Sequence, residues 1–247
     1  MKVLASYNIK GGVGKTAAAV NISYLAAHQG WRTLVWDLDP QGAASFYFRI
    51  KSKVKSGVKG IINRKHDLSD IIKGTDFEDL DLIPADFSYR NMDLLLDDKK
   101  NSSQHLHKLL KPLSDDYDFI ILDCPPSISL VSESVFYAAD ALLVPIIPTI
   151  LSIRTLEQLI RFQKKKKLDN MKVSAFFSMV DRRKKLHKEI VDNPPLNETC
   201  FLKSEIPYAS DVEKMGMHRA PLPSYAPQSR SSQAYSNLWD EVILRLK

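Results

Sequence analysis

The sequence predicts an α/β fold: a single domain, residues 1–247, whose mostly parallel central sheet is covered by helices on both faces. Short runs that are apolar on both faces alternate with segments of helical periodicity, a pattern typical of parallel strands buried between helices. A chain of 247 residues with 44% apolar content can bury one sizeable core. The sequence contains no repeat of fixed period and no long linker, so we expect one domain.

The predicted elements alternate along the chain. The expected strands cover residues 3–9, 33–36, 80–83, 119–122, 141–145, 173–177 and 201–206. The clearest helical patterns cover residues 15–28, 153–167 and 231–245. Residues 51–65 are basic and weakly patterned, and we expect an exposed loop or a short helix there.

The strongest functional signal is a glycine-rich turn between the first strand and the first helix. It consists of Lys10, Gly11, Gly12, Val13, Gly14, Lys15 and Thr16, followed by Ala17. Glycines let the backbone curl so that several N–H groups point at phosphate oxygens, and the helix adds its positive end. Lys15 would supply a charge to the β- and γ-phosphates, and Thr16 a hydroxyl to Mg²⁺. This order predicts a P-loop; the alternative is a turn without a ligand.

The spacing departs from the usual G-x-x-x-x-G-K-[ST] pattern. The first glycine of that pattern would fall at Ile9, whereas the glycines stand at positions 11, 12 and 14. A second lysine, Lys10, precedes them. The turn is therefore a deviant form of the Walker A motif.

Aspartates follow two of the predicted strands. Asp37 and Asp39 come after the strand at 33–36, and Asp123 comes after the strand at 119–122. Ligands of an open α/β sheet lie beyond the carboxyl ends of its strands, so the three carboxylates should meet near the glycine-rich turn. There they suit a Mg²⁺ shell or the orientation of an attacking water. The alternative is that they only cap the next turn or helix.

Cysteine content, targeting signals and base-reading motifs indicate the compartment of the protein and the nucleotide it binds. Two cysteines, Cys124 and Cys200, make no disulfide framework. We expect Cys124 to be a small buried side chain that packs in the core beside the site. The first residues show no signal-peptide pattern, and no apolar run is long enough to span a membrane, which predicts a cytoplasmic protein. The guanine-reading N-K-x-D pattern is absent, and residues 178–181 read Ser-Met-Val-Asp, which favours ATP over GTP.

With these motifs the sequence resembles the ParA/MinD superfamily, and within it the ParA-type partition ATPases. The resemblance covers nearly the whole chain. It includes KGGVGKT at 10–16, DLDPQG at 37–42, DCPPS at 123–127, the stretch at 142–159, VDRRKKLHKEI at 180–190 and the C-terminal segment at 206–242.

The resemblance implies roles for individual residues. Lys10 would be the signature lysine that reaches across an ATP-bound homodimer to the partner's phosphates. Asp39 would position or activate the hydrolytic water and, with Thr16 and Asp123, complete the Mg²⁺ site. Met179 and Pro207 would flank the adenine. The family's hydrolysis is slow and is stimulated by a partner protein such as ParB.

The resemblance also implies a surface partner, which is the nucleoid for ParA and the membrane for MinD. Residues 1–150 carry 17 basic and 18 acidic side chains, and residues 151–247 carry 18 and 11, so the net charge of +6 arises in the C-terminal part. This charge permits non-specific DNA binding. The candidate contacts are Lys164, Lys165, Arg182, Arg183, Arg219 and Arg230. Tyr208 and Asp211 stand where close relatives carry arginines.

Four functions compete. The leading prediction is an ATPase that positions or partitions a plasmid, a chromosome or a protein assembly. The second is a MinD-like membrane-associated regulator of division or flagellar placement, but the last helix has no lysine-rich polar face and is expected to dock on the core. A relative of the nitrogenase iron protein and a small-molecule P-loop kinase rank below these.

Overall fold

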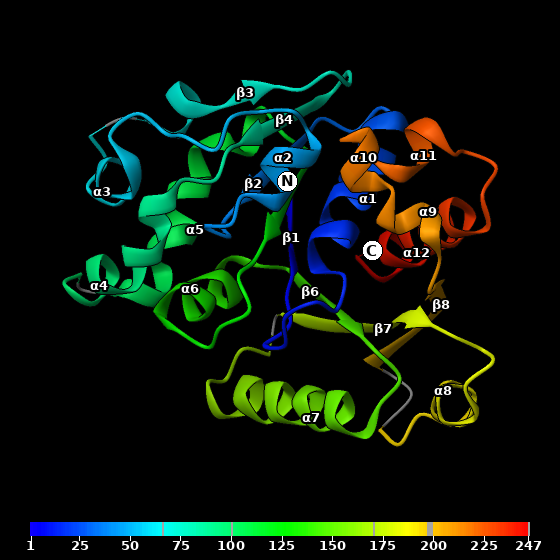
Figure 1. The fold of residues 1–247 in the computed structure, drawn as a ribbon. Coiled ribbons are helices and arrows are strands. Elements are labelled where there is room, and N and C mark those ends of the chain that lie inside the picture. The colour runs from blue at the N-terminus through cyan, green and yellow to red at the C-terminus, as the bar shows by residue number, and fades with distance from the viewer. Residues whose placement is uncertain (66, 100, 170, 197–199, 247) are drawn as a thin grey trace.

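The computed structural model describes residues 1–65, 67–99, 101–169, 171–196 and 200–246. In that part of the chain the strands form one eight-stranded sheet in the order β3-β4-β2-β5-β1-β6-β7-β8 (Figure 1). Neighbouring strands are parallel except for β3, which is antiparallel to β4. The strands are β1 (Lys2–Ser6), β2 (Thr33–Asp37), β3 (Lys73–Gly74), β4 (Leu80–Ile83), β5 (Phe119–Asp123), β6 (Ala141–Ile146), β7 (Lys172–Val180) and β8 (Phe201–Pro207). The predicted mostly parallel sheet is confirmed.

Helices connect these strands. They are α1 (Lys15–His28), α2 (Ala43–Tyr47), α3 (Gly57–Ile62), α4 (Met92–Asp97), α5 (His105–Leu110), α6 (Leu130–Ala138), α7 (Ile150–Lys165), α8 (Lys185–Asp192), α9 (Ser210–Glu213), α10 (Met215–His218), α11 (Leu222–Tyr225) and α12 (Arg230–Leu246). Short 3₁₀ turns complete the path: η1 (Leu68–Ile71), η2 (Phe87–Asn91), η3 (Ser102–Gln104) and η4 (Lys111–Asp115). The prediction for 15–28 matches α1, and α3 is the short helix expected within 51–65.

Two elements differ from the prediction. The first strand ends at Ser6 rather than at residue 9, because the chain turns from Asn8 into the glycine-rich loop. The edge strand β3 has two exposed residues and no apolar pattern, so the sequence offered no signal for it.

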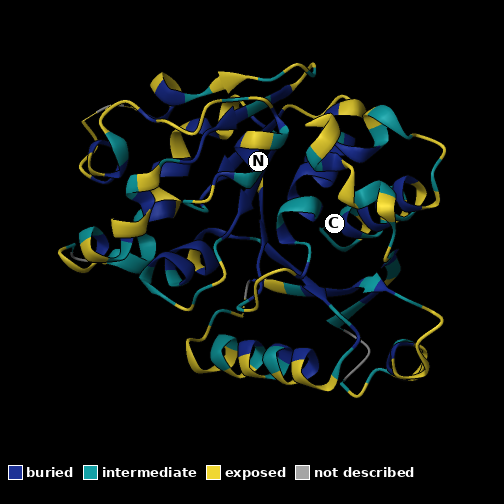
Figure 2. Ribbon diagram, viewed as in Figure 1, coloured by how far each residue is buried: buried dark blue, intermediate teal, exposed yellow. Residues whose placement is uncertain are grey.

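The sheet lies between two apolar layers, and its central strands are buried throughout (Figure 2). One layer combines one face of the sheet with α3 to α7, and its largest members include Trp36, Tyr89 and Phe136. The other combines the opposite face with α1, α2 and α12 and includes Phe176 and Trp239. Both faces of the sheet are therefore covered, as expected for parallel strands.

The last helix docks on this second layer. Tyr235, Leu238, Trp239 and Val242 are buried along one face of α12. The Trp239 indole also donates a hydrogen bond of 2.9 Å to the Gln29 side chain at the end of α1. The expectation that the last helix docks on the core is thus confirmed. Within the described residues, no helix is long and apolar enough to cross a bilayer.

Candidate nucleotide-binding site

The glycine-rich turn connects β1 to α1 at the carboxyl edge of the sheet. Gly12 and Gly14 have φ angles of 70° and 94°, a region that favours glycine. A Cβ atom at Gly14 would lie 2.9 Å from the Ser178 Oγ at the end of β7. Glycine at position 14 therefore serves both the backbone conformation and the close approach of the neighbouring strand.

Two buried polar residues hold this turn in place. The Asn8 side chain donates a hydrogen bond of 2.8 Å to the Pro145 carbonyl oxygen and accepts one of 2.9 Å from the Lys10 amide. The Ser6 hydroxyl donates to the Lys15 carbonyl oxygen at 2.8 Å. Asn8 was not among the predicted site residues, although a polar residue within an apolar strand run is a signal that it has a specific partner.

The two lysines of the turn lie in different environments. Lys15 is buried, and its Nζ atom donates to the Lys10 carbonyl oxygen at 3.3 Å. Burial lowers the pKa of Lys15, while Asp123 and Asp39 act in the opposite direction, so both carboxylates are close neighbours. Lys10 is exposed. One ammonium group therefore belongs to the interior of the site, and the other faces outward.

Asp37 and Asp123 occupy paired positions at the ends of β2 and β5. Both side chains are fully buried. Asp37 is satisfied: its Oδ2 atom accepts hydrogen bonds of 2.8 Å from both the amide and the hydroxyl of Ser45. Its Oδ1 atom accepts a weaker one of 3.3 Å from the Asp39 amide. Burial raises the pKa of Asp37 to about 6. This hydrogen bonding gives Asp37 a structural role, one of the two alternatives open from sequence.

Asp123 is not satisfied in this way. Among the described residues, neither oxygen of its carboxylate accepts a hydrogen bond of normal geometry, although the Thr16 hydroxyl is near enough to lower its pKa. Burial raises the pKa of Asp123 well above its usual range, Asp37 and Asp39 add to the shift, and Thr16 and Lys15 oppose it. A buried carboxylate without hydrogen bonds is costly unless a cation compensates it.

The donor set fits a magnesium ion that uses few protein ligands. Within the described chain, no three His, Cys, Asp or Glu side chains form a metal cage by themselves. Mg²⁺ usually keeps several waters and binds one or two protein groups together with phosphate oxygens. The Thr16 hydroxyl and the unsatisfied Asp123 carboxylate are groups of that kind, and they lie beside the phosphate turn.

Asp39 lies at the edge of the site, half-buried. Its Oδ1 atom accepts a hydrogen bond of 2.9 Å from the Gln41 amide, which fixes the side chain at the start of the turn that leads to α2. Its charge acts on both Lys15 and Asp123. The structure therefore brings Lys15, Thr16, Asp39 and Asp123 together, although they come from three separate segments.

The end of β7 lies beside the turn, and β8 is the next strand of the sheet. Val180 pairs with Pro207, so Met179 and Pro207 occupy adjacent strand ends. Met179 has a left-handed φ of 54° within an irregular part of the strand. Ser178 approaches Gly14, as described above. Met179 therefore follows the residue that approaches the turn, and Pro207 lies one strand further out.

The basic residues named as DNA contacts are dispersed and differ in their availability. Arg182 binds Glu205 and Asp192 at 2.8 and 2.7 Å, and Arg183 binds Asp181 at 2.8 Å. The Arg219 guanidinium lies 4.7 Å from the centre of the Phe46 ring and donates to the Phe46 carbonyl oxygen at 3.2 Å. Lys164 and Lys165 are exposed at the end of α7, and Arg230 is exposed at the start of α12.

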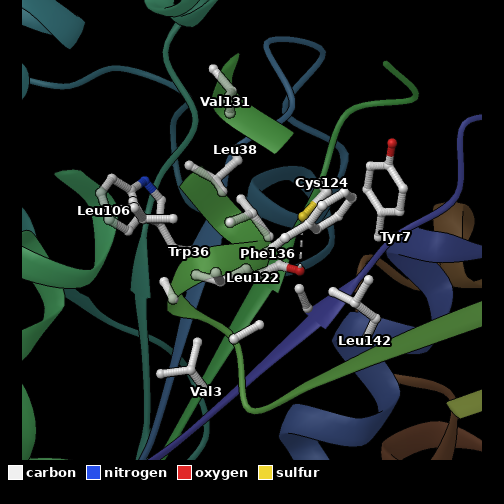
Figure 3. Packing of buried hydrophobic residues seen from close by; sticks show 14 of the residues in the cluster. Val3, Tyr7, Trp36, Leu38, Leu106, Leu122, Cys124, Val131, Phe136 and Leu142 are labelled. Atoms are coloured by element: carbon white, nitrogen blue, oxygen red, sulfur yellow. Dashed lines mark hydrogen bonds between the residues drawn. The ribbon is translucent and has the colours of Figure 1, made fainter. Parts of the chain in front are cut away.

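Cys124 lies directly after Asp123 but belongs to the core. Its sulfur sits among buried apolar side chains and donates to the Leu122 carbonyl oxygen at 3.7 Å (Figure 3). Burial raises the pKa of its thiol, and Asp123 adds to the effect. A neutral, enclosed thiol is a poor nucleophile, which agrees with the predicted role as filler.

Together, the parallel sheet, the glycine turn after its first strand and the carboxylates at the ends of β2 and β5 define a P-loop nucleotide-binding protein. A family model described as an AAA domain matches residues 1–175. Over 247 residues the chain is 32% identical to the sporulation initiation inhibitor protein Soj of Bacillus subtilis (strain 168), covering 98% of each chain. The chain belongs to this AAA-domain family and to the ParA/MinD superfamily of partition ATPases.

Solved structures share the fold. A cobyrinic acid a,c-diamide synthase from Mycobacterium smegmatis, with bound ATP analogue and magnesium, has a TM-score of 0.81 and 26% identity over 99% of this chain and 95% of its own. A plasmid partition protein from Borrelia burgdorferi B31 bound to AMPPNP has a TM-score of 0.85 at 21% identity, covering 99% of each chain. The second likeness concerns the fold alone.

Proposed function

We propose that this chain is an ATP-dependent dimerising switch that positions or partitions cargo, such as a plasmid, a chromosome or a protein assembly. The observation that carries the proposal is that one lysine of the phosphate turn is buried and the other is exposed. Buried Lys15 serves the nucleotide of its own chain, and exposed Lys10 is available to the nucleotide of a second chain. Membership of the ParA/MinD superfamily of partition ATPases supports a partition role for such a switch.

The cofactors of this function are ATP and Mg²⁺. The amides of residues 11–17 cradle the phosphates, Lys15 binds the β- and γ-phosphates, and Met179 and Pro207 flank the adenine. Thr16, Asp123 and Asp39 would hold the magnesium shell, directly or through water. A magnesium ion held by them would supply positive charge to the phosphate oxygens. Asp123, whose carboxylate accepts no hydrogen bond of normal geometry in the described chain, is the residue best suited to this shell.

Hydrolysis would depend on the dimer. Asp39 orients the attacking water, and Lys10 of the partner subunit stabilises the transferring phosphoryl group as an arginine finger does in other NTPases. Because the site is complete only in the dimer, turnover is slow until a ParB-like partner protein stimulates it. Loss of the γ-phosphate removes the charge that holds both Lys10 side chains, and the dimer opens.

The ATP dimer would associate with the nucleoid through sequence-independent DNA binding. Of the C-terminal candidates in the described chain, Arg182 and Arg183 are in ion pairs and Arg219 lies against Phe46, which leaves Lys164, Lys165 and Arg230. A MinD-like membrane role is less well supported, because the apolar face of α12 is buried against α1 and β8. A protein that binds the nucleoid in this way would act in the cytoplasm.

Light scattering tests the switch directly. With Mg²⁺ and a slowly hydrolysed ATP analogue the wild type should double in mass, and with ADP it should remain a monomer. Lys15→Ala should fail to bind nucleotide, whereas Lys10→Ala should bind nucleotide as a monomer. ATP turnover by a monomer that depends on a small-molecule acceptor would instead identify a kinase and refute the proposal.

A further inference from the structure

Residues 51–65 form the most basic segment of the chain. They contain six basic side chains and no acidic one, in the order Lys51, Lys53, Lys55, Lys59, Arg64 and Lys65. All six are exposed. The segment follows α2 and runs through α3, within residues 1–150, which otherwise carry 11 basic and 18 acidic side chains. We call these six side chains the α3 basic surface.

The cations of the α3 basic surface are available to a partner. In the part of the chain that the structure describes, none of the six forms an ion pair. This distinguishes them from Arg182, Arg183 and Arg219, whose guanidinium groups already bind carboxylates or an aromatic ring. An anion that binds here has no internal salt bridge to break.

The backbone beneath these cations is firmly attached to the core. The Val54 amide donates to Asp86 at 2.8 Å, and the Val58 amide donates to the Ser88 hydroxyl at 2.8 Å. Val54, Val58, Ile61 and Ile62 are buried in the apolar layer under the sheet. The lysines therefore project from a fixed platform, so less entropy is lost when a ligand binds than with a disordered basic tail.

Further cations lie between the α3 basic surface and α5, but acidic side chains offset them. Burial lowers the pKa of His105, and Arg64, Lys99 and Lys108 lower it further. The Lys99 ammonium donates to the Asn63 side chain at the end of α3, at 2.7 Å. The pocket between Arg64 and Lys108 also contains Asp67 and Asp116, so the uncompensated charge lies on residues 51–59 and not in that pocket.

We propose that the α3 basic surface binds the phosphodiester backbone of duplex DNA and is the principal DNA contact of this chain. Sequence-independent DNA affinity comes from lysine and arginine side chains that neutralise phosphates, and it needs no apolar insertion. Binding to a bilayer surface relies on large apolar side chains beside the cations, and the four apolar residues named above all point inward. Phe87 on η2 is an exposed aromatic side chain, and the Arg90 guanidinium lies over one face of its ring, 4.1 Å from the centre.

The α3 basic surface is separate from the C-terminal candidates. In Figure 1, α3 lies at the left end of the molecule, whereas α9 to α12 lie at the right and α7 lies below. The inference rests on the proposed function only in naming DNA as the partner. It replaces the C-terminal residues as the main contact, so the two surfaces can be tested against each other.

The experiment measures the affinity for a short duplex of scrambled sequence, by fluorescence anisotropy with the full chain, ATP and Mg²⁺ over a series of salt concentrations. One variant carries Lys51→Gln, Lys53→Gln and Lys55→Gln, and a matched variant carries Lys164→Gln, Lys165→Gln and Arg230→Gln. Both lose three charges at exposed positions, so the global charge effect is the same.

The first variant should lose about 100-fold in affinity near physiological salt, and its slope of log affinity against log salt should fall by roughly three. The matched variant should change much less. Equal losses, or a larger loss in the matched variant, would overturn the inference and leave the C-terminal surface as the DNA contact. Association with anionic phospholipid vesicles that requires Lys51, Lys53 and Lys55, without DNA binding, would overturn it in favour of a membrane.

Dimer formation by light scattering separates this inference from the proposed function. The first variant should still form the ATP dimer, because its three substitutions lie outside the phosphate turn. If the wild type forms the dimer but binds no DNA at any salt concentration, the α3 inference fails and the switch survives. If no dimer forms while DNA still binds through residues 51–55, the switch fails and the α3 inference survives.

Discussion

Asp37 and Asp123 are paired across β2 and β5, and both are buried, yet they differ in their hydrogen bonding. Ser45 donates twice to Asp37, whereas Asp123 accepts no hydrogen bond of normal geometry from a described group. The Ser45 hydroxyl in turn accepts a hydrogen bond of 2.9 Å from the Ala85 amide, which ties the loop after β4 to the site. Asp37 therefore has a structural role, and the Asp123 carboxylate is available to bind a ligand.

The first prediction concerns the two carboxylates. Asp123→Asn should abolish magnesium-dependent ATP binding and yet raise the free energy of unfolding without ligands by about 1–2 kcal/mol, because a buried uncompensated charge is removed. Asp37→Asn should lower it by a similar amount, because the new amide group faces the Ser45 donors. Calorimetric titration and urea unfolding measure both effects. A destabilised Asp123→Asn would show that its carboxylate is already satisfied in the free protein.

The second prediction concerns pH. The pKa of Asp37 rises on folding to about 6, so the folded state holds its proton more tightly than the unfolded chain. The stability from this group is fully present below the unfolded pKa of about 4, and it is lost as the pH rises through about 6. Urea unfolding over this range should show that contribution falling with pH in the wild type. Asp37→Asn should lack it; an identical pH profile would contradict the assignment.

The third prediction separates binding from hydrolysis. Asp39→Ala should keep ATP binding and the ATP dimer but lower turnover by at least about 100-fold, because the water would lose its orienting carboxylate. Phosphate release and light scattering on the same sample measure both properties. Asp140→Ala, at the amino end of β6 and away from the site, is the control and should turn over normally. Normal turnover by Asp39→Ala would remove this residue from the mechanism.

The fourth prediction tests the fit of the phosphate turn. Gly14→Ala should cost about 1–2 kcal/mol for its left-handed φ and more for the contact with the Ser178 hydroxyl. Adding Ser178→Gly should restore the part due to the contact and leave the backbone part. Gly216→Ala is the control, because its new Cβ would meet open space. Denaturant unfolding of the three variants measures how much of the lost stability comes from the contact and how much from the backbone. If Ser178→Gly restores no stability, the whole loss is due to the backbone conformation.

The local signals in the sequence were strong at the phosphate turn. Glycines 12 and 14 adopt the left-handed conformation for which the residue type is selected, and α1 starts at the predicted lysine. Asp39 and Asp123 follow apolar runs that do form adjacent parallel strands, so their convergence followed from a general rule of α/β sheets. The conformation of the turn and the convergence of the strand ends can be predicted from sequence, because they depend on residues a few positions apart or on strand direction.

The supporting residues carried no comparable signal. Ser45 lies eight positions after Asp37, and Ser178 is far from Gly14 in the chain, so only the folded sheet brings each pair together. The same holds for the basic residues. Arg182 and Arg183 looked available as a charged run, but the fold places Glu205 and Asp192 against Arg182, and Arg183 turns back to Asp181.

The sequence by itself determined that the chain forms a mostly parallel α/β sheet with a phosphate turn and carboxylates at one edge, because backbone conformation and strand polarity are set locally. The tertiary structure alone decided which carboxylate is satisfied, which lysine faces outward and which cations are unpaired. Those properties depend on distances between segments that are remote in the chain, and a linear pattern contains no information about such distances until the segments pack.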